Sequence, residues 1–355
     1  MTIGAAMSFV ILGTGSDLPP KIVTNEDIER ASTDYDPVRA GQSLHEWVMR
    51  RAGVASRHRL EGGEGTSDMA VRAARRALDN AGVTVEEIDL VVLGTFTSDS
   101  RQPSTVSLVQ QALGGSAKCL QLETACTGFV DSLLVATSVM SAAGYRTALV
   151  ITAEAMSAVV DPERFMYQSL FGDGAAAVVL RDLPGSGYGI EALRTHTDAT
   201  HCDWTWVPGG GTKHPITAQV LAERSQYVTL DAKAIYRFAV DKMVEASHEV
   251  LGIVGLTIDD VDWLIPHQTG ANIIAEVVEE LKVPPERVIT CLDHTGNVSG
   301  ASVAIALDEA RAGGLLNDGD RVLIPVVGGG MAWGAVSLVW RRPAADALAQ
   351  ERAAS

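Results

Sequence analysis

The sequence predicts a mixed α/β fold built from two related halves. Segments with helical periodicity alternate with short runs rich in β-forming residues, as in α/β proteins. Part of the chain also repeats itself further along, which indicates duplication. The length of 355 residues and a composition of 46% hydrophobic and 20% charged residues are typical of a globular protein with a substantial core.

The predicted elements alternate along the chain. The first run, FVILGTG, is expected to be a strand and not part of a signal peptide, because no basic region precedes it. The short apolar runs predict strands at 9–15, 90–96, 148–154, 176–180, 263–267 and 322–330. The longer periodic segments predict helices at 67–81, 126–143, 231–251, 270–281 and 300–313.

The internal repeat joins two helix–strand units. LDNAGVTVEEIDLVVLGTF (78–96) resembles LGIVGLTIDDVDWLIPHQT (251–269), with Asp89 and Asp262 at one offset of 173 residues. RTALVITAE (146–154) matches RVLIPVVGG (321–329) at an offset of 175 residues. The alternative is that two α/β units merely look alike, but the nearly constant offset favours a duplicated fold. We divide the chain into halves at 1–184 and 185–355.

Charge and hydropathy exclude some functions. The formal net charge of −16 argues against broad nucleic-acid binding, which depends on basic residues that neutralise phosphates. No apolar run reaches the roughly 18–20 residues of a membrane span, so no membrane association is expected. The four cysteines lack metal-ligand spacing and a disulfide pattern, which favours a reducing cytoplasm.

One stretch, RRAGVASRHR (50–59), concentrates positive charge. On an acidic protein, a local basic patch can attract acidic small partners. The alternative is a solvated helix end followed by a turn. The basic residues are Arg50, Arg51, Arg57, His58 and Arg59.

Cys126 lies where the extended run CLQLETA meets a helical pattern. A thiol at a helix N-terminus feels the positive end of the macrodipole, which favours the thiolate. Such a cysteine can act as the nucleophile of acyl transfer. The other cysteines fit the alternative of a small buried hydrophobic side chain: Cys119, Cys202 and Cys291.

Three further segments place chemical groups at predicted strand ends and turns, where sites of α/β folds commonly lie. His267 follows the apolar strand WLIP, and Asn297 lies in a turn that enters a helix through small residues. Three glycines follow the strand that ends in VV, where backbone N–H groups could bind a reactive carbonyl. Taken singly, each has a structural alternative: a structural histidine, a turn-forming asparagine and a tight loop.

The motifs TACTGF, FGDGAA, PHQ, GNVSGAS and GGGMAWG, in this order, resemble those of the β-ketoacyl-ACP synthase III family. The resemblance extends from ILGTG near the start to the last strand before Arg341. It implies a thiolase fold, with two pseudo-symmetric halves in a five-layered αβαβα arrangement, and a homodimer. It also implies an acyltransferase of the condensing type. An acyl group from acyl-CoA or an acyl carrier is loaded on the enzyme, and decarboxylative Claisen condensation with a malonyl thioester gives a 3-ketoacyl product in fatty-acid or polyketide biosynthesis.

The resemblance assigns roles to individual residues. Cys126 matches the acylated nucleophile, and His267 and Asn297 match the pair that binds the malonyl thioester carbonyl. The backbone N–H groups of Cys126 and Gly329 match the oxyanion hole. Residues 171–174, FGDG, match a supporting turn. The resemblance implies coenzyme A thioesters as substrates and no requirement for a metal or a redox cofactor.

Trp47 and Arg51 match the pair that holds coenzyme A at the tunnel mouth. This match shifts the interpretation of the basic stretch toward a substrate entrance, which would also suit an acidic carrier protein.

Three departures from the family pattern favour a specialised-metabolism member acting on an unusual acyl chain, such as a polyketide-priming synthase. Residues 269–272 read Thr-Gly-Ala-Asn in place of Ala-Asn-x-Arg, so the arginine implicated in carrier docking is absent. The segment between Asn25 and Trp47 is several residues longer, and Val327 stands where Phe is frequent.

Two other functions remain as alternatives. One is a family member that only transfers the acyl group to a hydroxyl or an amine, which the retained Asn297 disfavours. The other is a non-catalytic carrier-binding or scaffold subunit, which the joint presence of Cys126, His267 and Asn297 disfavours.

Overall fold

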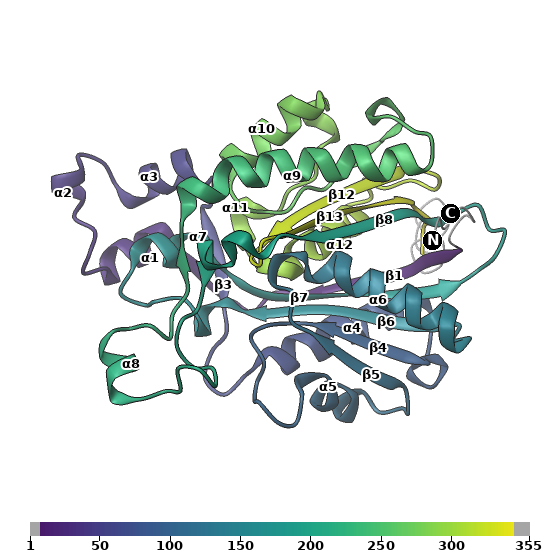
Figure 1. Ribbon diagram of the computed structural model, residues 1–355, viewed down its shortest axis with the longest axis horizontal. Helices are drawn as coiled ribbons and strands as arrows, with labels where there is room; N and C mark the ends of the chain where they lie inside the picture. Colours follow the sequence, from purple (N-terminus) through teal and green to yellow (C-terminus); the bar gives the residue numbers. More distant parts are fainter. Residues whose placement is uncertain (1–7, 344–355) are drawn as a thin grey trace, which may run out of the picture.

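The computed structural model describes residues 8–343 and arranges them in five alternating layers of helices and sheets (Figure 1). The first strand, predicted at 9–15, is present, while residues 1–7 before it lie outside the described part. Two mixed sheets are separated by a central layer of helices, and further helices cover both outer faces. This is the αβαβα arrangement expected from the sequence.

The first sheet has five strands, which in spatial order are β1 (Phe9–Asp17), β7 (Asp173–Asp182), β6 (Thr147–Ala155), β4 (Leu90–Gly94) and β5 (Lys118–Leu122). β4 is parallel to both neighbours, and β7 is antiparallel to both of its own. The inner strands are almost continuously apolar because helices cover both faces of the sheet. The helices on the outer face are α4 (Thr66–Ala81) and α5 (Thr105–Leu113).

The second sheet has four strands, which in spatial order are β11 (Trp263–Leu264), β12 (Arg321–Gly328), β13 (Ala332–Val339) and β8 (Gly189–Thr197). Helices α9 (Ala232–Ile253) and α10 (Ala271–Leu281) cover its outer face. β11 is shorter than the predicted strand 263–267, but the chain continues beside β12, because the backbone N–H groups of Ile265 and His267 donate to Leu323 and Pro325. β8 and β13 had not been predicted.

The central layer contains α6 (Gly128–Ala143) and α12 (Ser302–Ala312), each preceded by a short 3-10 turn, η2 (Ala125–Thr127) or η7 (Ser299–Ala301). Side chains of both helices join the largest apolar core, between the two sheets. Within residues 8–343, one helical stretch, Ala125–Ala143, is long and apolar enough to cross a membrane, and half of it is buried inside the protein. Its place between the sheets is that of a core helix.

Equivalent hydrogen bonds in the two halves confirm the internal repeat. The carboxylate of Asp89 accepts from the backbone N–H of Arg146, and that of Asp262 accepts from Arg321, both at 2.8 Å. The short turns η1 (Val85–Glu87) and η5 (Ile258–Asp260) precede these residues and begin with the same capping box. The division of the chain at residue 184 stays a prediction, although β7 ends before it and β8 begins after it.

Among the remaining elements, α1, α2, α3, α7 and α8 lie at one end of the molecule (Figure 1). The longer segment between Asn25 and Trp47 folds into three short helices, of which α2 projects outward. The helices are α1 (Asn25–Ala31), α2 (Pro37–Ala40), α3 (Leu44–Arg51), α7 (Phe165–Leu170), α8 (Ala218–Ala222) and α11 (Leu292–Thr295). The short strands are β2 (Lys21–Thr24), β3 (Ser56–Arg59), β9 (Thr205–Trp206) and β10 (Thr229–Leu230). The other 3-10 turns are η3 (Met156–Ala158), η4 (Ala199–Trp204) and η6 (Pro285–Arg287).

Candidate active site

A cavity of about 640 Å³ lies where strands of both sheets end. β4, β6, β11 and β12 each lead to residues that line it, as expected for a site at the strand ends of an α/β fold. Its wall is mainly apolar, with Phe96, Met156, Phe171 and Met331 among the lining side chains. The cavity therefore suits a ligand with a substantial apolar part.

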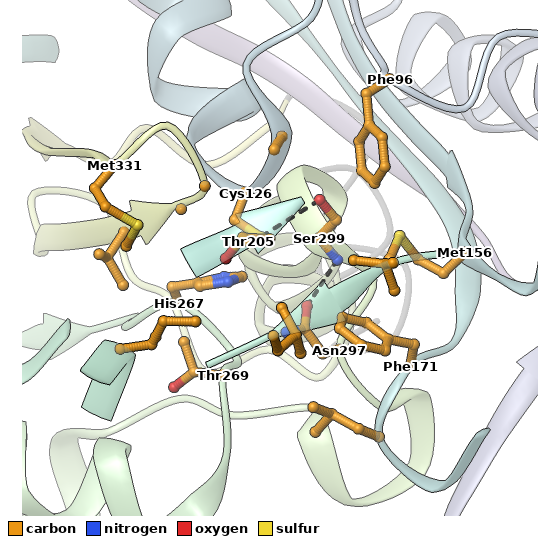
Figure 2. A pocket seen from close by; sticks show the side chains of 18 of the residues that line it. Phe96, Cys126, Met156, Phe171, Thr205, His267, Thr269, Asn297, Ser299 and Met331 are labelled. Carbon is orange, nitrogen blue, oxygen red and sulfur yellow. Dashed lines mark hydrogen bonds between the residues drawn. The ribbon is translucent and has the colours of Figure 1, made fainter. Parts of the chain in front are cut away.

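Cys126, His267 and Asn297 all line this cavity, although they come from distant parts of the sequence. Figure 2 shows the three side chains around one space, with Ser299 beside Cys126. Gly328, the last residue of β12, and Gly329 after it line the same space. The structure thus brings together the residues predicted for the nucleophile, its partners and the oxyanion hole.

Cys126 occupies the turn η2 at the start of the central helix α6. Ala125 before it has a left-handed backbone, with φ of 46°. A Cβ atom added at Gly328 would lie 3.0 Å from the Cys126 Cβ and 3.1 Å from its nitrogen, so any larger residue would push against Cys126. The triple-glycine turn is therefore packed directly against the backbone of Cys126.

Burial raises the pKa of the Cys126 thiol to about 11, while a hydrogen bond from Ser299 acts in the opposite direction. The rise corresponds to roughly 3 kcal/mol, which exceeds the typical contribution of a helix dipole of about 1 kcal/mol. Burial therefore opposes ionisation of this thiol, and the expectation that the helix N-terminus favours the thiolate stays a prediction.

His267 is almost completely buried, with 1% of its surface exposed. Burial lowers the pKa of its imidazole to about 4, so the ring is neutral at physiological pH. Its backbone N–H donates to Pro325, and Nδ1 has no hydrogen-bond partner in the described chain. A proton on Nε2 makes that nitrogen a donor without leaving a buried N–H group unpaired at Nδ1.

Asn297 is fixed through its backbone and its side chain. Its backbone N–H donates to Leu170 at 2.8 Å, and its carbonyl accepts from the N–H of Gly172 at 3.1 Å. The FGDG segment thus holds the asparagine turn, in agreement with the predicted supporting role. The side-chain Oδ1 accepts from the backbone N–H of Ser299 at 2.8 Å, so the Nδ2 group remains as a donor for a ligand.

Three residues around the site were not predicted. The side-chain oxygen of Gln268 accepts from the N–H groups of Cys291 and Leu292, which ties the histidine loop to the helix before Asn297. Ser299 contacts the sulfur of Cys126, and Glu154 is a buried acid at the end of β6. Gln268 and Ser299 lie in the motifs PHQ and GNVSGAS, which is the signal that places them near the site. No pattern in the sequence predicts the contacts themselves.

Trp47 and Arg51 lie together on α3, but in the described chain neither lines the cavity. The Arg51 guanidinium lies 5.6 Å from the centre of the Trp47 ring, and Trp47 packs edge-on against Phe165. The Arg51 carbonyl accepts from the side chain of Asn272, next to the cavity-lining Ile273. The pair therefore lies close to the cavity but outside it.

The interpretation of residues 50–59 as one basic patch is wrong. Arg57 is completely buried and donates to Asn25, Val23 and Ser169, while Arg59 is buried beside Asp173. Burial lowers the pKa of Arg57 to about 9. Within residues 50–59, the exposed arginines are Arg50 and Arg51 at the end of α3.

The expectation for the other cysteines holds in part. Cys291 is completely buried and Cys119 is partly buried. Cys202 is exposed, so its interpretation as a buried hydrophobic residue is wrong. In the described residues, no group of three or more His, Cys, Asp or Glu side chains could hold a metal ion.

The duplicated five-layered architecture and the cavity between its halves define a thiolase-fold acyltransferase. The sequence profiles of the 3-oxoacyl-[acyl-carrier-protein (ACP)] synthase III family match residues 120–199 and, for its C-terminal part, 251–340. β-Ketoacyl-[acyl-carrier-protein] synthase III 3 from Streptomyces coelicolor is 38% identical over 339 residues, which cover 95% of this chain and 98% of that protein.

Solved structures agree with the sequence comparison. The 3-oxoacyl-[acyl-carrier-protein] synthase III of Aquifex aeolicus superposes with a TM-score of 0.84 at 33% identity, covering 94% of this chain and all of that one. The priming β-ketosynthase of the R1128 polyketide pathway superposes with a TM-score of 0.83 at 31% identity, covering 97% and 99%. The chain belongs to the β-ketoacyl-[acyl-carrier-protein] synthase III family and is an acyl-transferring condensing enzyme of fatty-acid or polyketide biosynthesis.

Proposed function

We propose that this enzyme carries its acyl group on Cys126 and uses His267 and Asn297 to activate a malonyl thioester. The observation that supports this most directly is the convergence of the three side chains on one apolar cavity. The orientation of Asn297 adds to it, because its Oδ1 is already bonded and its Nδ2 is available. The chemistry requires a thiol nucleophile on one side and neutral hydrogen-bond donors on the other.

In the first half-reaction, the Cys126 sulfur attacks the carbonyl carbon of an acyl thioester. The bond to the leaving thiol breaks, and the cysteine proton passes to that thiol. The backbone N–H groups of Cys126 and Gly329 stabilise the oxyanion that forms. Each donor of this kind is worth about 3–4 kcal/mol of barrier reduction.

In the second half-reaction, a malonyl thioester loses carbon dioxide and leaves an enolate. The Nε2–H of His267 and the Nδ2–H of Asn297 donate to the enolate oxygen. A neutral His267 suits this role, since its lowered pKa keeps it a donor without a charge. The enolate carbon then attacks the acyl-cysteine carbonyl, which releases a 3-ketoacyl product and restores the cysteine after one proton is taken up.

We further propose that Arg51, stacked on Trp47, binds the phosphates of coenzyme A outside the cavity. Arg51 is exposed, and its carbonyl accepts from the side chain of Asn272. Asn272 lies at the start of α10, next to the cavity-lining Ile273. Position 272 is Asn, where the family pattern has the arginine implicated in carrier docking. This difference supports coenzyme A over a carrier protein as the donor of the loaded acyl group. The apolar wall supports an apolar acyl chain as the group carried on Cys126.

We also propose that the enzyme is a cytoplasmic homodimer. β5 pairs only with β4 in the described chain and forms a partly exposed edge, which offers backbone groups to a second copy. All four cysteines are free, which suits a reducing compartment. Size-exclusion chromatography with light scattering tests the dimer, and a monomer at micromolar concentration would refute it.

Mass spectrometry of enzyme and products tests the central proposal. The enzyme is incubated with acyl-CoA donors of graded length, and then with malonyl-CoA or a malonyl carrier protein. We expect acyl adducts on the peptide that contains Cys126, and a ketoacyl product formed with loss of carbon dioxide. Acylation of Cys126 without that product, under all extenders, would identify an acyltransferase to a hydroxyl or an amine. Absence of any acyl adduct would support a non-catalytic subunit.

A further inference from the structure

The two turns that begin the central helices are equivalent and touch each other. Ala125 and Ser299 are both non-glycine residues with a left-handed backbone, with φ of 46° and 49°. A Cβ atom added at Gly300 would lie 2.6 Å from the Ala125 carbonyl oxygen, so the turns are in direct contact. The duplication thus places the start of the second central helix against the start of the first, which carries Cys126.

Across this contact, the hydroxyl of Ser299 donates to the sulfur of Cys126, at an Oγ–Sγ distance of 3.5 Å. Ser299 is 1% exposed, and its backbone N–H is held by Asn297. Its hydroxyl has no other hydrogen-bond partner among residues 8–343. The Cys126 sulfur is therefore the one acceptor that this hydroxyl has in the described chain.

We propose that Ser299 is a catalytic hydrogen-bond donor to the Cys126 thiolate. The inference rests on the proposed role of Cys126 as the acylated nucleophile. During loading, the Sγ–carbonyl carbon bond forms and the bond to the leaving thiol breaks. The cysteine proton goes to the leaving thiol, while Ser299 keeps its own proton and stabilises the sulfur charge before attack.

The other titratable groups around Cys126 do not provide this stabilisation. His267 is neutral above pH 4 and faces the cavity from the second half. Asp131 on α6 accepts from Thr127, and Glu123 lies at the cavity edge before η2, and neither donates to the sulfur in the described chain. Ser299 is thus the side-chain donor that the structure offers to the sulfur.

The test measures the charge state of the sulfur without requiring condensation. The rate of Cys126 alkylation by iodoacetamide is followed by peptide mass spectrometry from pH 6 to pH 10. The variant is Ser299→Ala, and the control is Ser132→Ala. Ser132 is a buried serine of α6 whose hydroxyl has no partner in the described chain. Alanine suits position 299 because Ala125 adopts the same backbone conformation.

Loss of a hydrogen bond to a charged group predicts alkylation of Ser299→Ala about 10- to 100-fold slower at pH 7. Ser132→Ala should follow the wild-type profile.

An unchanged profile in Ser299→Ala would overturn the role of Ser299. Failure of acyl-CoA to label Cys126 in the wild type would instead overturn the proposed function. Thermal unfolding of each variant shows that a slower reaction does not reflect an unfolded chain.

Discussion

Gly172 connects the FGDG turn to the turn that carries Asn297, and its replacement by alanine should uncouple the two half-reactions. A Cβ atom at this position would lie 2.0 Å from the carbonyl oxygen of Thr295. Ordinary contact begins at 3.4 Å, so the two segments must separate by more than 1 Å. Because Gly172 donates to the Asn297 carbonyl, this separation displaces the asparagine.

A misplacement of about 1 Å at a reacting centre costs roughly 100-fold in rate, or about 2.7 kcal/mol of barrier. We therefore expect Gly172→Ala to reduce condensation about 100-fold while Cys126 is still acylated, since Cys126 belongs to a different turn. Overpacking should also lower the free energy of unfolding by about 1–3 kcal/mol, which denaturant titration measures.

The assay follows both steps separately: acyl adducts on the Cys126 peptide, and release of carbon dioxide from a malonyl thioester. Gly174→Ala is the matched control, because a Cβ atom there would meet the mobile side-chain ends of Leu18 and Ile305 at 3.0 and 3.2 Å. A folded Gly172→Ala enzyme with wild-type condensation would show that the FGDG turn does not position Asn297. A folded variant that loses acylation and condensation equally would show that the two steps are not separable here.

Three further predictions concern other residues of the site. Asn297→Ala should lower condensation by about 10²- to 10³-fold but leave Cys126 acylation within a few-fold of the wild type, measured by the same two assays; equal loss of both steps would contradict the assignment. Arg51→Ala should raise the KM for acyl-CoA about fivefold without changing kcat, and the difference should shrink at high salt, whereas Arg39→Ala on α2 should change neither; an unaffected KM would place coenzyme A elsewhere. The pKa of His267 is about 4 in the folded protein and about 6.5 in an unfolded chain. Between these pH values the unfolded state binds more protons than the folded state. The contribution of His267 to stability is therefore complete above pH 6.5 and is lost as the pH falls toward 4. Urea titrations should therefore show that the wild type loses about 3 kcal/mol more than His267→Gln between pH 7 and pH 4, and equal losses would disprove the burial argument.

The architecture was predictable because its signals are local or repeated. The buried strands are short apolar runs, and the duplication is visible as a nearly constant offset with the same Asp before each strand. β13 was missed because Gly334 and Ser337 interrupt its apolar pattern directly after a glycine turn.

The positions of Cys126, His267 and Asn297 followed from motif order, but their supporting contacts did not. Ser299 reaches Cys126, and Gly172 reaches Asn297, only through pairings between segments far apart in the chain. The basic stretch failed for another reason. In a four-residue strand such as β3, alternation separates Arg57 and Arg59 from His58, but the sequence does not tell which set faces inward.

The contact between the two helix starts has a consequence for biosynthesis of the enzyme. The first half leaves the ribosome before the second exists, so Cys126 is then without Ser299, His267 and Asn297. Neither half by itself carries the residues of both half-reactions, so condensation requires the two halves to dock. The appearance of condensing activity during translation or refolding therefore reports the docking of the two halves, which is the last assembly step. It should come later than any signal of strand formation in either sheet.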